Sequence, residues 1–87
     1  MKVNVLTMYE KLYEGEAAKV VLPGEDGEFS VWNFHQPCLY ALRGGRITIV
    51  PRVSVSEPRK ANPENRISIK RGIVKIASSR LTALVEV

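Results

Sequence analysis

Hydrophobic and polar residues alternate with a period of two in several short stretches of this chain. Residues 2–5, 46–49, 67–70 and 80–87 each place apolar side chains at every second position. Successive side chains of a β-strand point to opposite faces, so this period is typical of strands with one buried face. Shorter β-branched or aromatic runs, which favour strands as well, lie at residues 20–22, 29–32 and 73–76.

Turn signals separate these stretches at intervals typical of a β-sandwich or barrel. The longest helix that the pattern allows is one turn at residues 39–43, and we favour a strand continuing to Leu42. We expect that Gly24, Gly27, Gly44 and Gly45 can adopt positive φ, which a Cβ atom would disfavour. The predicted turns are Glu14-Gly15, Pro23-Gly24, Asp26-Gly27, Gly44-Gly45, Arg71-Gly72 and Ser78-Ser79.

Length and composition indicate one all-β domain spanning residues 1–87. Apolar residues make up 45% of the 87 positions, which is ordinary for a globular domain. Residues 51–66 contain three prolines and little core pattern beyond Val53 and Val55, so we interpret them as an extended hairpin loop. No apolar run reaches the roughly 20 residues of a membrane span, and the N-terminus lacks an apolar signal core. We expect a soluble protein that could still sit on a membrane complex.

Charge is divided unevenly along the chain, whose formal net charge is +4. Residues 1–30 hold three lysines against six acidic residues, whereas residues 31–87 hold ten basic residues against three acidic ones. The basic part raises the hypothesis of a small basic β-barrel that binds nucleic acid. A solvated surface of mixed sign is the interpretation we favour, because the basic loop has no interleaved aromatic residues to stack on bases. Its cations are Arg52, Arg59, Lys60 and Arg66.

His35 and Cys38 are the two residues that invite a catalytic or metal-binding hypothesis. They are the sole histidine and cysteine of the chain, whereas a structural zinc site needs about four ligands. A Cys-His nucleophilic pair would also need an orienting group and an oxyanion hole. Cys38 has no second cysteine for an internal disulfide, and its apolar surroundings favour a small buried thiol. We expect no catalytic residue, no cofactor and no metal.

Four of the six aromatic residues lie within twelve positions: Phe29, Trp32, Phe34 and Tyr40. Strand alternation points Phe29 to one side, whereas Trp32 and Phe34 point to the other. Both sets cannot fill the same core. We therefore expect one set to lie inside and Trp32 or Phe34 to anchor a partner, because aromatic residues are enriched at interface centres.

A longer motif carries a family resemblance. Residues 22–29 read Leu-Pro-Gly-x-x-Gly-Glu-Phe and residues 35–42 read His-x-Pro-x-Leu-x-x-Leu, a combination that resembles the epsilon subunit of F-type ATP synthases. Further segments similar to that family follow in the same order, namely residues 3–7, 13–17, 45–50, 67–76 and 81–86.

This resemblance implies a two-layer β-sandwich of about ten short strands in a noncatalytic rotor subunit. Such a subunit docks on the gamma subunit and the c ring of the synthase and helps to couple proton passage to ATP synthesis or hydrolysis. It lies at the cytoplasmic face of the bacterial inner membrane, associated with the membrane only through the complex. Residues matching the family's contacts are Glu28, Phe29 and Ser30 toward the c ring and Thr7, His35 and Tyr40 toward gamma.

Three departures from the family pattern bear on these expectations. Ser30-Val-Trp-Asn-Phe-His35 stands where the family has Gly-Val-Leu-Pro-Gly-His, and residues 51–66 exceed the usual connection. The sequence ends at Val87, before the helical hairpin in which the family carries inhibition of ATP hydrolysis and, in some members, ATP binding. Neither property is ascribed to this chain. A buried structural histidine remains the alternative for His35, and an enzyme using His35 and Cys38 is the least favoured hypothesis.

Overall fold

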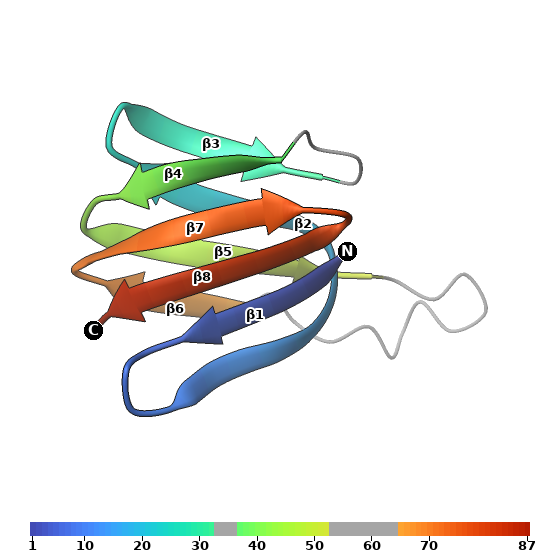
Figure 1. Ribbon diagram of the computed structural model, residues 1–87, viewed down its shortest axis with the longest axis horizontal. Helices are drawn as coiled ribbons and strands as arrows, with labels where there is room; N and C mark the ends of the chain where they lie inside the picture. The colour runs from blue at the N-terminus through green and yellow to red at the C-terminus, as the bar shows by residue number, and fades with distance from the viewer. Residues whose placement is uncertain (33–36, 53–64) are drawn as a thin grey trace.

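The computed structural model describes residues 1–32, 37–52 and 65–87, and all regular secondary structure in these ranges is β-strand (Figure 1). The predicted all-β class and the strand ending at Leu42 are confirmed. Eight strands are present in the described ranges, compared with the expected ten or so. They are β1 (Lys2–Leu6), β2 (Lys11–Gly24), β3 (Gly27–Val31), β4 (Cys38–Leu42), β5 (Gly45–Pro51), β6 (Asn65–Ile69), β7 (Arg71–Ala77) and β8 (Arg80–Glu86).

The strands form two layers that share the long strand β2. One layer runs in the order β1-β8-β7-β4, and Figure 1 shows β2, β5 and β6 passing behind it. The first part of β2 pairs with β1, and its later part pairs with β3 and β5, beyond which lies β6. Every pairing is antiparallel except that of β1 with β8. Because β2 belongs to both layers, it holds their inner faces against each other.

The core contains the apolar side chains that the alternation assigned to one face of each strand. Val3 and Val5 on β1 and Ile47 and Ile49 on β5 are fully buried. On β8, the apolar face that was predicted to be buried is buried as far along the strand as Val85. The largest fully buried side chains are Leu22, Ile47, Ile49, Ile76 and Leu81.

Three of the predicted turns are wrong. Pro23 and Gly24 are the last two residues of β2, where they pair with Glu28 and Gly27. Glu14 and Gly15 lie inside β2, where they pair with Asn4 and Val3, so strand pairing overrides the local turn preference. Arg71-Gly72 begins β7, and the preceding bend is at Lys70. The turn at Ser78-Ser79 is confirmed, and both serines have positive φ, 50° and 59°.

Glycines near the β2–β3 turn serve two different purposes. Gly27 has φ of 134°, as expected for a residue that a Cβ atom would strain. The same expectation is wrong for Gly24, Gly44 and Gly45, none of which has a positive φ. Gly24 instead allows close packing, because a Cβ atom there would lie 2.7 Å from the Gly27 carbonyl oxygen and 2.8 Å from the Phe29 ring.

The two-layer core predicts a contrast between two isoleucines. Ile49 is 0% exposed, so Ile49→Ala should lower the free energy of unfolding by about 2–5 kcal/mol through lost burial and a residual cavity. Ile73 is 51% exposed on the outer face of β7, so Ile73→Ala should cost well under half as much. Urea denaturation followed by circular dichroism measures both. Equal losses would show that β5 does not line the core.

Candidate docking surfaces

A row of apolar side chains crosses the outer face of the layer β1-β8-β7-β4. Leu6 pairs with Leu84, Leu84 with Ile73, and Ile73 with Ala41, so the four occupy consecutive register positions. Each has a buried neighbour on its own strand, namely Val5, Ala83 and Val85, Val74, and Leu42, so the row itself points away from the core. We call Leu6, Leu84, Ile73 and Ala41 the apolar row. Contiguous apolar side chains on an outer face make it a candidate surface for contact with another molecule.

The turn between β1 and β2 adds two exposed side chains beside this row. Met8 is 85% exposed and Tyr9 is 92% exposed. Thr7 fixes the turn, because its Oγ1 accepts hydrogen bonds from the backbone N–H groups of Tyr9 (3.1 Å) and Glu10 (3.0 Å). Its own N–H donates to the Glu10 carbonyl oxygen at 2.8 Å. The turn, together with Leu84, Ile73 and Ala41 of the row, lines a groove of about 770 Å³, which we call the apolar groove.

An ion pair lies among the residues that line the apolar groove. Arg71 Nε donates to Glu86 Oε2 at 2.7 Å, between residues that pair directly across β7 and β8. This hydrogen bond and the accompanying attraction lower the pKa of Glu86 and raise that of Arg71. Both side chains are exposed, so the pair contributes little to the stability of the fold.

A second groove, of about 390 Å³, lies at the turn between β2 and β3. The structure brings together here the three residues expected to contact the c ring, Glu28, Phe29 and Ser30. Glu28 and Ser30 are exposed, whereas Phe29 is half-buried and packs against the core. We call this the turn groove.

Thr7, His35 and Tyr40 were expected to contact the gamma subunit. Tyr40 lines the turn groove, whereas Thr7 lines the apolar groove. The ring of Tyr40 lies 4.9 Å from that of Phe29, at an interplanar angle of 50°. Ala41 lines both grooves, so the two are adjacent. His35 lies outside the described residues.

The aromatic side chains divide as the alternation predicted. Phe29 faces the core, whereas Trp32 is 62% exposed on the outer face of the other layer. The Lys19 ammonium lies 6.0 Å from the centroid of the Trp32 ring, within cation–π range. Phe34 lies outside the described residues.

Cys38 is half-buried against the core, in keeping with a small packed thiol. Within residues 1–32, 37–52 and 65–87, no three His, Cys, Asp or Glu side chains converge as metal ligands. Most of the basic loop at residues 51–66, including Arg59 and Lys60, lies outside the described residues.

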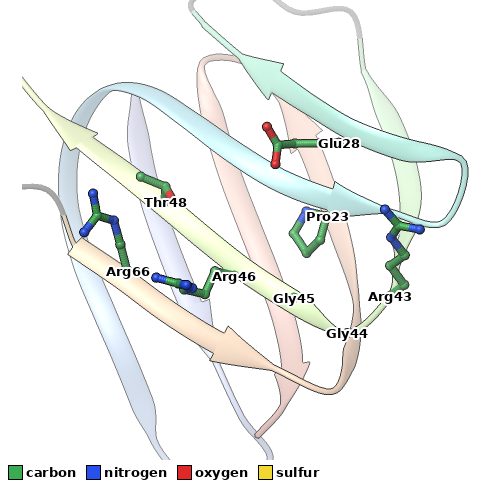
Figure 2. Close-up of a pocket in the computed structure, with 8 residues that line it drawn as sticks. All are labelled: Pro23, Glu28, Arg43, Gly44, Gly45, Arg46, Thr48 and Arg66. Carbon is green, nitrogen blue, oxygen red and sulfur yellow. The ribbon is translucent and has the colours of Figure 1, made fainter.

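A third hollow, of about 520 Å³, opens on the outer face of β2, β5 and β6 (Figure 2). Sequence reasoning missed this hollow, because the β5–β6 pairing that places Arg66 opposite Thr48 spans a long connection. The sequence did contain one signal for it: Arg46 and Thr48 alternate with two core isoleucines, which places both side chains on the outer face of this strand. We call it the basic hollow, and its lining residues are Pro23, Glu28, Arg43, Gly44, Gly45, Arg46, Thr48 and Arg66.

Comparisons with known proteins agree on one family. The family model described as "ATP synthase, Delta/Epsilon chain, beta-sandwich domain" matches residues 1–87. An ATP synthase epsilon chain of Sulfurimonas denitrificans is 34% identical over 86 residues, covering 99% of this chain and 60% of that protein. One of Bordetella avium is 32% identical over 84 residues, covering 97% of this chain and 54% of that protein.

The chain thus spans between half and two thirds of the length of these two relatives. An epsilon chain of Chlorobium limicola is shorter: the chain is 28% identical to it over 85 residues and covers 88% of its length.

Solved structures show the same fold. A chain in the Tetrahymena thermophila mitochondrial ATP synthase central stalk and c ring superposes with a TM-score of 0.77 at 17% identity, covering 99% of this chain and 63% of that one. A chain in the Euglena gracilis mitochondrial ATP synthase superposes with a TM-score of 0.78 at 12% identity, covering 95% of this chain and 48% of that one. The described residues contain no helix of the length and apolarity that crossing a membrane would require.

The Arg71–Glu86 pair predicts a titration that can be measured directly. The pKa of Glu86 should lie below its usual value, so any stability gained from the pair is present above the unfolded-state pKa and is lost as pH falls through the folded-state pKa. Carboxyl ¹³C NMR titration should show the lowered pKa, and Arg71→Gln should return it toward normal. Lys11→Gln is the control, because Lys11 lowers the pKa of Glu14 instead. An unchanged Glu86 titration in Arg71→Gln would refute the pairing in solution.

Proposed function

Because the chain belongs to the family of ATP synthase delta/epsilon chain β-sandwich domains, we propose that it is a noncatalytic central-stalk subunit of an F-type ATP synthase. In this role it docks on the gamma subunit and the c ring and helps to couple proton passage to ATP synthesis or hydrolysis on other subunits. It lies at the cytoplasmic face of the membrane and is held there by the complex. The observation that supports docking best is the apolar row on an outer face of the sandwich.

The apolar groove is the surface that we assign to the gamma subunit. Leu84 and Ile73 are half-exposed, and Met8 and Tyr9 are almost fully exposed. Burial of apolar area stabilises a contact by about 25 cal/mol per Å². Strand pairing and the Thr7 hydrogen bonds hold the backbone of these residues in place, so docking need order only their side chains.

The turn groove is the surface that we assign to the c ring. Glu28 presents an exposed carboxylate next to the exposed hydroxyl of Ser30, a combination suited to polar loops of a partner. Phe29 supports the turn from inside through its ring contact with Tyr40. Its proposed part is therefore to hold Glu28 and Ser30 in position.

Leu84→Asp tests the gamma assignment. A carboxylate in the middle of the apolar row should weaken binding to purified gamma at least about tenfold, because a charge would be desolvated in the contact. Ser68→Asp, on exposed β6 of the other layer, is the matched control and should leave the affinity unchanged. Biolayer interferometry measures both variants. The assignment would be contradicted if both variants bind gamma normally, or if both lose binding. Absence of binding by the unmodified chain would contradict the proposed function.

Glu28→Lys tests the c-ring assignment separately. Charge reversal at the β2–β3 turn should reduce co-migration of the chain with the c ring on native gels and leave gamma binding intact. Glu14→Lys makes the same charge change at an exposed position on the first part of β2, and it should retain co-migration. Equal retention by both variants would remove Glu28 from the contact.

A further inference from the structure

An acidic residue lies at each end of the apolar groove. Glu10 belongs to the turn that follows β1, whereas Glu25 follows the end of β2, on the edge of β4 that β7 does not occupy. Figure 1 shows these two turns on the same side of the molecule, at opposite ends of the strand series β1, β8, β7 and β4. Both glutamates line the groove, so carboxylates flank its apolar centre.

These two carboxylates have no counter-ion within the groove. Both side chains are exposed, and neither carboxylate makes a hydrogen bond or ion pair with any residue in the described ranges. The other charged side chains of the lining, Arg71 and Glu86, pair with each other. Lys75 shares the outer face with Ile73 but does not line the groove. With three glutamates and one arginine, the lining side chains carry a net charge of −2.

The spacing of the apolar row matches one face of a helix better than an extended segment. Neighbouring strands lie about 4.8 Å apart, so side chains of the row repeat at that interval. One helical turn rises about 5.4 Å, whereas alternate side chains of an extended segment repeat at about 6.7 Å. From Leu6 to Ala41 there are three strand intervals, over which a helix departs from the row by about 2 Å and an extended segment by about 6 Å. A helix lying across the strands therefore keeps its apolar stripe over the row.

We propose that the apolar groove receives an amphipathic helix of the gamma subunit whose apolar stripe has a lysine or arginine at each end. Apolar side chains at positions i, i+4 and i+7 of this helix pack on Leu84, Ile73 and Ala41, and the flanking cations meet Glu10 and Glu25. A second copy of this chain fits the groove less well, because a symmetric contact would bring the same acidic surface against itself. The proposal rests on the assignment of the groove to gamma and specifies what gamma presents.

Biolayer interferometry with purified gamma and the full chain measures the contribution of the two carboxylates. Glu10→Lys and Glu25→Lys should each weaken binding about tenfold or more, because the reversal places like charges opposite each other. Asp26→Lys is the matched control: it makes the same charge change one residue from Glu25, at a position that lines the turn groove and not the apolar groove. It should keep the affinity of the unmodified chain. Added salt should weaken binding of the unmodified chain more than binding of a Glu10→Gln, Glu25→Gln double variant.

Hydrogen–deuterium exchange of the complex tests the form of the occupant. The unmodified chain should protect one gamma segment with helical apolar spacing between two basic residues, and the Glu10→Lys and Glu25→Lys variants should protect it less. A protected segment with period-two alternation or with acidic ends would overturn the proposal.

Three further outcomes separate this inference from the proposed function. Normal gamma binding that the Glu10→Lys and Glu25→Lys variants leave unchanged, or that Asp26→Lys weakens equally, would overturn this inference alone. Self-association of the chain that Leu84→Asp abolishes would place a second copy in the groove and overturn it as well. Absence of gamma binding by the unmodified chain would overturn the proposed function and this inference together.

Discussion

Packing between the inner faces of the two layers is the interaction on which every other feature depends. The fourteen residues of β2 make this packing possible, because the strand pairs with β1 in one layer and with β3 and β5 in the other. Leu22 and Ile49 are consequently buried without any contribution from a helix in the described residues. Since inward positions are fixed by this core, the outward position of each alternate side chain is fixed as well.

The two outer faces have opposite chemical character as a result. One carries the apolar row and the exposed turn at Met8 and Tyr9, whereas the other carries the basic hollow and the Lys19–Trp32 contact. Strand register sets the apolar row on the first face and the positions of Arg46 and Thr48 on the second. A close-packed core between them has low compressibility and transmits strain. A subunit that adheres to moving partners requires such stiffness.

Local pattern was sufficient to predict the fold class, the buried faces of β1, β5 and β8, and the opposite orientations of Phe29 and Trp32. It could not predict the length of β2, because Glu14-Gly15 has the composition of a turn and becomes a strand only through pairing with β1. The basic hollow was missed for a related reason, since Arg46 and Arg66 meet through pairing across a long connection. The place of Tyr40 beside Phe29 likewise depends on how β4 meets β3.

Under the proposed function, force between the two partners passes through the junction of β2 and β4. Gly24 pairs with Leu42, and the backbone N–H groups of Glu25 and Arg43 donate to the carbonyl oxygens of Ala41 (3.1 Å) and Pro23 (2.9 Å). Ala41 lines both grooves, so this hydrogen-bonded junction lies where they adjoin. Gly24 has no room for a Cβ atom beside the Gly27 carbonyl and the Phe29 ring, which keeps the junction short. A short link held by these backbone hydrogen bonds between the two proposed contact surfaces would give one partner little freedom to move relative to the other.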